Sequence, residues 1–262
     1  MSDPLQSFPR ASALSPRLET LASTASTNAD LLRAVAGDPG TWPDLSVILT
    51  TDQRAGRGRL DRVWTAPAGT ALAASVVVDC TGIPMAVRGW VPLLAGAAMT
   101  RAVSEQLPGE GERVRLKWPN DVLVDGAKLC GILAEVVPGN PDVVVVGSGV
   151  NTAMTRDQLP VPTATSFAVL GVTCDVDALV ASYLTHLRAQ IGALRGADGN
   201  VEALVRDIES LCATLGRDLT VSLPDGTVLR GVGQRIETDG RLVVATGDRE
   251  VAVSAGDVVH VR

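Results

Sequence analysis

The sequence predicts an α+β fold in which a mixed β-sheet, packed with helices, is followed by a small β-barrel. Up to residue 215, short runs of branched apolar residues are interspersed with longer segments that have helical spacing. After Gly216 the chain changes to short alternating strands separated by turn residues. We therefore expect a flexible leader over residues 1–17, a larger domain over residues 18–215 and a barrel domain over residues 216–262.

The elements of the larger domain follow from caps, turn residues and apolar periodicity. Ser26, Thr27 and Asn28 precede a short apolar segment that stops at Gly37, which is typical of a capped helix with a glycine end. Pro92 stands near the start of a longer helical segment, where proline is tolerated. In chain order we expect a helix over 29–36, strands over 45–51 and 71–78, a helix over 89–106, strands over 114–117, 122–124, 129–137 and 143–146, a helix from 176, and a helix over 201–215.

The second domain is predicted from short segments in which apolar and polar residues alternate. Turn sequences rich in proline, aspartate and glycine separate them, which favours tight connections and a closed barrel. The strands expected are 219–223, 227–234, 241–245, 250–253 and 258–261, with turns at 224–226, 239–240 and 255–257.

The composition of the 262 residues is that of a globular protein, with 46% hydrophobic and 20% charged residues. No apolar run reaches the ~20 residues that a membrane helix needs, and no secretion signal pattern begins the chain. We therefore expect a cytoplasmic protein without a membrane partner. The net charge of −6 argues against nucleic acid as the main partner, because phosphate contacts need a broad basic face.

The cysteines and histidines do not predict a zinc site. Four cysteines are far apart without a C-x-x-C pair, and only two histidines could join them. We expect reduced thiols that pack as small hydrophobic side chains, and no metal held by protein ligands alone. These residues are Cys80, Cys130, Cys174, Cys212, His186 and His260.

Residues 53–64 form a basic segment in which glycines alternate with arginines. Four arginines and one aspartate give it a charge of +3 within an acidic chain. The glycines let backbone amides approach an anion, and the arginines offer planar groups suited to phosphate or carboxylate. The segment therefore predicts an anion-binding loop, with a solvated basic turn as the alternative when it is considered alone. The residues concerned are Gly56, Arg57, Gly58, Arg59 and Arg62.

A second polar cluster lies around a predicted hairpin with a tight Asp125-Gly126 turn. We expect this hairpin to bring Lys117 and Lys128 side by side, where their ammonium groups suit a ligand carboxylate or phosphate. Asn120 can pair with an adenine-like edge, and Asp121 can orient a cation or an amine. Without these neighbours, each lysine would be interpreted as an ordinary surface residue.

Gly147 and Gly149 follow the last strand of the predicted larger sheet. They lack the third glycine of a dinucleotide-binding fingerprint, and no convincing helix begins there, so we reject that interpretation. We expect a bulged strand end at which a flat ligand lies against backbone. Trp64 and Trp118 are expected beside the ligand, whereas Trp90 is assigned to the core.

Taken together and in this order, these motifs resemble those of the biotin protein ligases, the enzymes that attach biotin to carboxylase carrier domains. The resemblance runs from about residue 20 to the end of the chain. The sequence departs from the family pattern at Asp61, where glycine is usual, and at Cys130, where alanine is common. The motifs are Ser26-Thr27-Asn28, Gly56-Arg57-Gly58-Arg59 with Arg62-x-Trp64, Lys117-Trp118-Pro119-Asn120-Asp121, Lys128-Leu129-x-Gly131-Ile132-Leu133-x-Glu135 and Gly147-x-Gly149-x-Asn151.

The resemblance implies a class II synthetase-like catalytic domain, an SH3-like barrel and a role for each matched residue. Catalysis would use Arg57, Lys117, Asp121 and Lys128. Biotin would contact Ser26, Thr27, Asn28, Gln53, Gly56, Arg57, Lys128 and Gly147. ATP and the adenylate would contact Arg57, Arg59, Arg62, Trp64, Asn120, Lys128 and Asn151.

The same resemblance implies an ATP-dependent ligase that uses Mg²⁺. Biotin would be activated as biotinyl-5′-AMP and transferred to a lysine in the biotin carboxyl carrier domain of an acyl-CoA carboxylase. There is no room before Ser26 for the DNA-binding domain of some members, so we expect a monofunctional enzyme without DNA binding, as a monomer or weak homodimer. The arginine loop is expected to be mobile when empty and to close over ligand.

Two alternatives stay open at this point. One is a lipoate or octanoyl ligase of the same architecture, against which the polar group of Ser26, Thr27 and Gln53 favours a cyclic urea as ligand. The other is a nucleic-acid-binding module made from the basic loop and the barrel, against which the acidic net charge argues.

Overall fold

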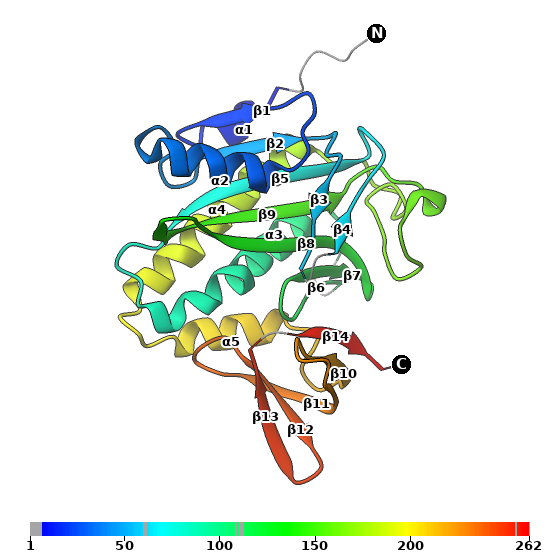
Figure 1. Cartoon of the computed structure of the whole chain (residues 1–262). Coiled ribbons are helices and arrows are strands. Elements are labelled where there is room, and N and C mark those ends of the chain that lie inside the picture. The colour runs from blue at the N-terminus through cyan, green and yellow to red at the C-terminus, as the bar shows by residue number, and fades with distance from the viewer. Residues whose placement is uncertain (1–6, 60–61, 108, 110–112, 255, 262) are drawn as a thin grey trace.

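Two β-sheets and a two-stranded hairpin organise the protein (Figure 1). The computed structural model describes residues 7–59, 62–107, 109, 113–254 and 256–261. The larger sheet is mixed and has seven strands in the order β1-β2-β5-β9-β8-β7-β6, of which only the β1–β2 pair is parallel among the described pairings. Its strands are β1 (Leu18–Thr20), β2 (Val47–Thr50), β5 (Ala71–Asp79), β6 (Val114–Lys117), β7 (Asp121–Val124), β8 (Ala127–Val137) and β9 (Asn140–Asn151).

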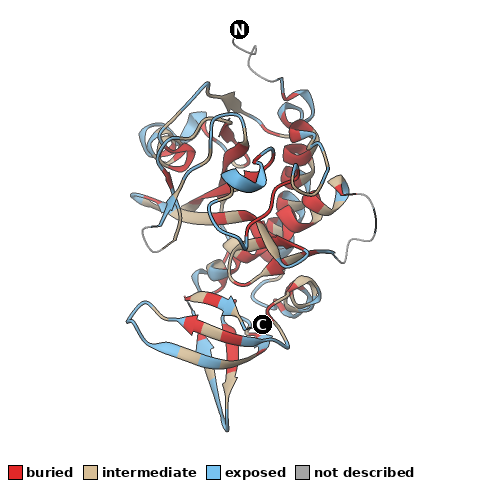
Figure 2. Cartoon of the chain, turned by 90° about the vertical axis from the view of Figure 1, so that its right-hand side faces the viewer, coloured by how far each residue is buried: buried red, intermediate tan, exposed pale blue. Residues whose placement is uncertain are grey.

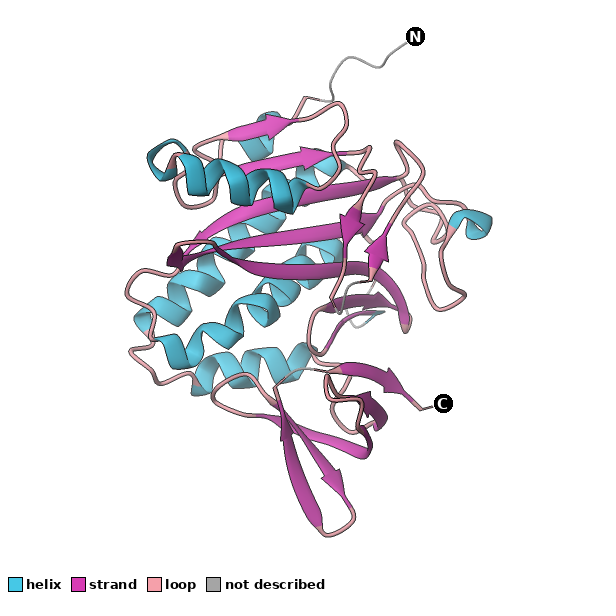
Figure 3. Cartoon of the chain, viewed as in Figure 1, coloured by secondary structure: helices cyan, strands magenta, loops and turns pink. Residues whose placement is uncertain are grey.

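Helices cover both faces of this sheet, because its central strands are apolar on both sides. Along β5, Val76 and Val78 belong to the core cluster that includes α3 and α4, whereas Val77 packs with Leu31 and Val35 of α2 in a second cluster. Figure 3 shows α2 in front of the sheet and the two long helices behind it. The α-helices are α1 (Pro9–Ser12), α2 (Thr27–Gly37), α3 (Val91–Gln106), α4 (Val176–Gly196) and α5 (Glu202–Leu211), and the 3-10 turns are η1 (Pro39–Thr41), η2 (Met85–Trp90) and η4 (Arg156–Gln158).

The predicted helix cap at the start of α2 is confirmed. Ser26 has an extended backbone, and its hydroxyl oxygen accepts a hydrogen bond from the Ala29 amide at 3.3 Å. Gly37 is the last residue of the helix, as its position in the sequence predicts. The cap fixes the first helical turn over the central strands, where the hydroxyl of Ser75 on β5 lies within hydrogen-bond distance of Thr27 and Asn28.

The N-terminal segment differs from the flexible leader that we expected. Phe8 and Ala11 are buried, and the backbone amides of Arg10 and Ala11 donate to the carboxylate of Asp177 on α4 at 3.1 and 3.0 Å. Local composition could not reveal this packing, because the partner lies more than 160 residues away in sequence. Residues 1–6, also assigned to the leader, lie outside the described residues.

Two strand predictions also need correction. Lys117 and Lys128 do not share one hairpin: Lys117 ends β6, Lys128 begins β8, and β7 lies between them. The glycines after residue 146 are not a bulged strand end, because β9 continues to Asn151 and pairs regularly with β5 from Val143 to Asn151. The helix predicted over 201–215 ends earlier, at Leu211.

The C-terminal sheet contains the five antiparallel strands that the sequence predicts, in the order β13-β12-β11-β10-β14. The edge strands β13 and β14 are not paired with each other in the described part of the chain, so the ladder does not close. Figure 2 shows that this sheet is more exposed than the larger one. Its strands are β10 (Asp218–Ser222), β11 (Val228–Ile236), β12 (Leu242–Thr246), β13 (Arg249–Val253) and β14 (Asp257–His260).

Two buried indoles join the two sheets. Trp90 and Trp118, both almost fully buried, donate from Nε1 to the carbonyl oxygens of Thr238 and Gly240 at 2.8 and 3.0 Å. The core assignment of Trp90 is confirmed. Trp118 does not line the cavity described below but a neighbouring one that it shares with Arg59 and Asn120, so its placement beside a ligand stays a prediction.

The four cysteines are free thiols, and three of them are buried, as expected. Burial raises the pKa of the Cys130 thiol to about 12 and that of Cys80 to about 11, so both remain protonated at neutral pH. Among the described helices, none has both the length and the apolar character required to cross a membrane.

Candidate ligand-binding site

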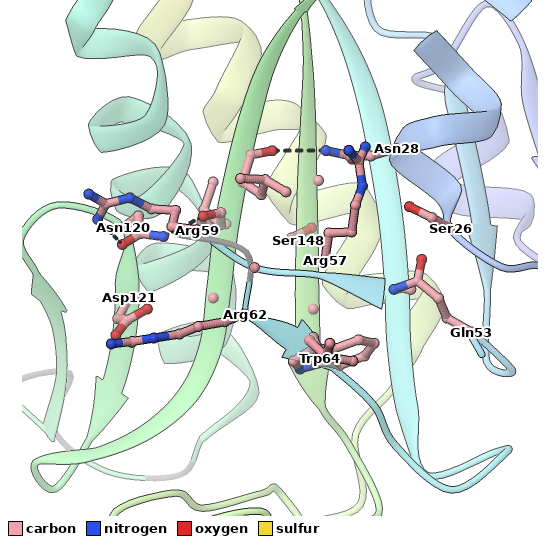
Figure 4. Close-up of a pocket in the computed structure, with 18 of the residues that line it drawn as sticks. Ser26, Asn28, Gln53, Arg57, Arg59, Arg62, Trp64, Asn120, Asp121 and Ser148 are labelled. Atoms are coloured by element: carbon pink, nitrogen blue, oxygen red, sulfur yellow. Dashed lines mark hydrogen bonds between the residues drawn. The ribbon is translucent and has the colours of Figure 1, made fainter. Parts of the chain in front are cut away.

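A cavity of about 190 Å³ opens between the start of α2, the exposed face of β8 and β9, and the loop that carries the arginines (Figure 4). It lies on the face of the sheet opposite α3, where the loop residues Gly56–Arg57 and Val63–Trp64 form the hairpin β3–β4. The residues that line it are Ser26, Thr27, Asn28, Gln53, Arg57, Gly58, Arg59, Arg62, Val63, Trp64, Ala73, Asn120, Asp121, Lys128, Gly131, Ile132, Leu133, Gly147, Ser148, Gly149, Gly256 and Asp257.

Neutral polar groups gather at one end of the cavity, around the first turn of α2. The backbone amide and the hydroxyl of Thr27 both donate to Oε1 of Gln53, at 2.8 and 3.1 Å. Asn28 Nδ2 donates to the Leu133 carbonyl at 3.2 Å. Because Gln53 accepts these bonds through its oxygen, its amide nitrogen remains available as a hydrogen-bond donor.

Two glycines are required for this packing. A Cβ added at Gly147 would lie 2.1 Å from Oδ1 of Asn28, and one added at Gly149 would lie 2.9 Å from the ring of Trp64. Trp64 therefore rests against bare backbone of β9, and Asn28 reaches the same strand two residues earlier, at Gly147. The Trp64 ring covers the backbone of Gly149, and the expectation that a flat ligand lies against this backbone stays a prediction.

The other end of the cavity, with Arg59 and Arg62, is cationic, and a third arginine, Arg57, lies beside Asn28. Arg57 Nη2 lies 2.9 Å from Oε2 of Glu135, which also accepts from Asn28 Nδ2 at 2.9 Å. Arg59 donates to Oδ1 of Asn120 at 3.1 Å, and burial lowers the pKa of its guanidinium. Figure 4 shows Arg57 on the side of Asn28, and Arg59 with Arg62 on the side of Asn120 and Asp121.

Asp121 connects the two lysines. Its Oδ1 lies 2.6 Å from Lys128 Nζ, and its Oδ2 lies 3.8 Å from Lys117 Nζ. The register shift between Val122 and Leu123 brings the start of β8 toward Asp121. Burial lowers the pKa of Lys117, whose side chain lies behind Asp121 rather than in the cavity wall.

The charges of the cavity wall do not cancel. Four cations (Arg57, Arg59, Arg62 and Lys128) face two carboxylates of the wall, those of Asp121 and Asp257, and a third carboxylate, that of Glu135 beside the wall, pairs with Arg57, which leaves +1 in a chain whose net charge is −6. Guanidinium groups beside an apolar floor bind phosphate and carboxylate oxygens more strongly than in open water, because the local dielectric is lower. The site can therefore hold an anion at one end and a neutral, hydrogen-bonding ring at the other.

The structure brings together most of the predicted site residues. Lys117 and Gly56 lie just outside the wall, and a Cβ at Gly56 would lie 2.4 Å from Nε2 of Gln53, so this glycine makes room for that side chain. Asn151 does not line the cavity; its Nδ2 donates to the Thr165 carbonyl at 2.9 Å. Asp61, the noted departure in the loop, lies outside the described residues.

Sequence reasoning missed several residues of the wall, and also Glu135, which lies beside it. Ser148, Ala73 and the backbone of Gly131 to Leu133 belong to strands whose facing direction follows only from the sheet register. Gly256 and Asp257 were interpreted as a turn of the C-terminal domain. Glu135 was part of a motif without a role, and its contact with Arg57 depends on two segments 78 residues apart.

The chain is similar to known biotin ligases in sequence. The family model described as "Biotin/lipoate A/B protein ligase family" matches residues 23–151. A biotin–[acetyl-CoA-carboxylase] ligase of Mycobacterium tuberculosis is 39% identical over 247 residues, which cover 94% of this chain and 90% of that protein. A biotin–[acetyl-CoA-carboxylase] ligase of Paracoccus denitrificans is also 39% identical, over 52% of this chain and 55% of its own length.

Solved structures show the same fold. The biotin protein ligase of Aquifex aeolicus in complex with biotin and ATP matches with a TM-score of 0.74 at 20% identity, covering 94% of this chain and 99% of that one. The biotin protein ligase of Leishmania major in complex with biotinyl-5-AMP matches with a TM-score of 0.57 at 23% identity, covering 94% and 99%.

Proposed function

Because this chain belongs to the biotin/lipoate A/B protein ligase family, and within it is similar over nearly its whole length to a biotin ligase, we propose that it activates biotin with ATP and transfers it to acetyl-CoA carboxylase. It is a biotin–[acetyl-CoA-carboxylase] ligase, and the lipoate and nucleic-acid alternatives are not favoured. The observation in this structure that best supports the function is a cavity with neutral donors and acceptors at one end and guanidinium groups at the other.

The first step joins biotin to AMP. A carboxylate oxygen of biotin attacks the α-phosphorus of ATP, the bond from that phosphorus to the bridging oxygen breaks, and pyrophosphate leaves with the electron pair. Negative charge grows on the α-phosphate oxygens, so fixed cations beside them lower the barrier. We assign this work to Arg57 and Lys128 in the cavity and to Lys117 behind it. The ureido ring would lie at Ser26, Thr27 and Gln53.

The second step passes biotin to the carrier. The neutral amine of a carrier lysine attacks the acyl carbon of the adenylate, the bond from that carbon to the phosphate oxygen breaks, and AMP leaves. A free lysine has a pKa of about 10.4, so a carboxylate that orients the amine and receives its proton favours the attack. We assign this part to Asp121, which already holds Lys128 at 2.6 Å.

The donor set of the cavity fits a Mg²⁺ ion that arrives with the nucleotide. Mg²⁺ is usually held by one or two carboxylates together with substrate phosphates, and the wall offers the carboxylate of Asp121. When bound, the ion would screen the triphosphate charge. Arg59 and Arg62 would share that charge, and Trp64 and Asn120 would contact the nucleoside.

The partner of the reaction follows from the same proposal. The acceptor is the biotin carboxyl carrier domain of an acyl-CoA carboxylase, and the enzyme works as a monomer or weak homodimer without DNA binding.

We interpret the C-terminal sheet as an SH3-like barrel. The free cysteines fit a cytoplasmic location, where thiols are kept reduced.

The proposed function is tested by ATP-dependent transfer of labelled biotin to a purified carrier domain. We expect label on the carrier only when ATP is present, and no transfer when lipoate replaces biotin. Transfer of lipoate at a comparable rate would contradict the assignment of the polar end to a cyclic urea. Absence of any ATP-dependent transfer of biotin would contradict the function itself.

A further inference from the structure

The C-terminal sheet contributes directly to the wall of the cavity. Asp257, the first residue of β14, faces Arg62 with both carboxylate oxygens, at 3.0 Å from Nη1 and 2.5 Å from Nη2. The carbonyl oxygen of Gly256 accepts from Nη2 of Arg59 at 3.1 Å. Two arginines of the loop are thus held by consecutive residues that lie almost 200 positions further along the chain.

The position of Asp257 is fixed by its surroundings. It pairs with Ser222 in the β10–β14 ladder, and the next residue, Val258, is buried in the C-terminal sheet. Gly256 packs so closely that an added Cβ would lie 2.8 Å from the Val221 side chain and 3.2 Å from the Ser222 carbonyl oxygen. Strand β14 therefore presents the Asp257 carboxylate from a paired backbone, although the Arg62 side chain that it contacts is long and mostly exposed.

The contact with Asp257 orients the Arg62 side chain and leaves part of its guanidinium group available to bind a ligand. Its side chain is 62% exposed, whereas that of Asp257 is 31% exposed. A guanidinium has five N–H groups in a planar fork, and a two-point contact with a carboxylate occupies two of them. The remaining N–H groups can reach a phosphate. Hydrogen bonding from Arg62 holds the pKa of Asp257 below its usual range, so the pair stays charged at neutral pH.

We propose that Asp257 is a positioning residue for ATP, which acts by fixing the guanidinium of Arg62 toward the phosphates. The inference rests on the proposed function and gives the C-terminal sheet a part in nucleotide binding. Asp257 itself is not required to touch the nucleotide. The neutral end of the cavity, with Ser26 and Gln53, has no contact with this pair, so biotin binding does not depend on it.

The test measures the KM of ATP and of biotin separately in the full-length enzyme, for the variants Asp257→Asn and Asp257→Glu. The pair is partly exposed but has two-point geometry, so we expect Asp257→Asn to raise the KM of ATP about fivefold and to change the KM of biotin less than about twofold. Asp257→Glu, which keeps the charge, should recover part of the loss. In an Arg62→Ala background, Asp257→Asn should have no further effect on the KM of ATP.

A matched control is Glu250→Gln. Glu250 lies in the same sheet and pairs with Arg235 at 2.9 Å, but it lies outside the cavity wall, so its KM values should equal those of the wild type. An unchanged KM of ATP in Asp257→Asn would overturn the proposal. A lower KM would also overturn it, since Asp257 would then compete with phosphate. Equal increases in the KM of ATP and in the KM of biotin, together with a lower unfolding temperature, would show that Asp257 acts only in folding. If the wild-type enzyme itself shows no ATP-dependent transfer of biotin, that result contradicts the proposed function as a whole.

Discussion

At the scale of single residues, the most specific chemical roles are those proposed for Lys128 and Asp121. Lys128 Nζ lies in the cavity wall, 2.6 Å from the Asp121 carboxylate, at the end of a strand whose backbone is held by the sheet. An ammonium fixed in this way needs little reorganisation when charge develops on a neighbouring phosphate.

Lys128→Ala should therefore slow adenylate formation by on the order of 10² to 10³, the usual effect of removing one such donor. The fold should be unchanged, because the side chain is partly exposed and makes no core contact. The measurement is pyrophosphate release under saturating substrates, with circular dichroism as the control for folding. A folded variant with a near-normal rate would contradict the assignment of Lys128 to the α-phosphate.

At the scale of elements, the hairpin β3–β4 and its flanking arginines form a cover over the cavity. Arg57, Arg59 and Arg62 each have a partner outside the loop, on β8, beside β7 and on β14. Two of these contacts, Arg57–Glu135 and Arg62–Asp257, are partly exposed ion pairs, and such pairs contribute only about 0–1 kcal/mol each, so they hold the cover weakly. A bound anion would add contacts to the same guanidinium groups.

Limited proteolysis with trypsin tests this cover. We expect cleavage after Arg57 or Arg59 in the ligand-free enzyme and slower cleavage when biotin and ATP are added, because the bound adenylate orders the loop. Arg206, an exposed arginine of α5 away from the cavity, serves as the internal reference. Equal cleavage of the loop with and without ligand would show that it does not close.

At the scale of the whole molecule, the two sheets are joined by buried indoles as well as by the cavity. Trp118 Nε1 donates to the Gly240 carbonyl, and Trp90 Nε1 donates to the Thr238 carbonyl in the same β11–β12 connection. Both rings are nearly fully buried. The C-terminal sheet is therefore fixed against the catalytic sheet close to the point where it supplies Asp257.

Trp118→Phe should lower the free energy of unfolding by about 1–3 kcal/mol, because the Gly240 carbonyl loses its buried donor. Urea denaturation followed by circular dichroism measures the change. Trp42→Phe provides the comparison, since its ring stacks with Arg17 at 4.0 Å away from both the cavity and the C-terminal sheet. Equal stability of wild type and Trp118→Phe would show that this hydrogen bond does not hold the sheets together.

Much of the fold and site could be predicted from local sequence. Branched apolar runs, the Ser26 cap and the glycine turns locate the central strands and α2, because their physics acts over a few residues. The arginine loop, the lysines and the polar residues before α2 were each identifiable as candidate ligand groups, and the structure brings nearly all of them to one cavity.

What only the tertiary structure decided depends on contacts between distant segments. The packing of residues 8–15 against α4, the place of Trp118 between the sheets and the contribution of Gly256 and Asp257 to the cavity wall all join residues far apart in the chain. The sequence by itself determined which residue types were available and the local elements that carry them. Which of them meet was decided by sheet register and domain packing, because the free energy of those contacts depends on positions that no local pattern specifies.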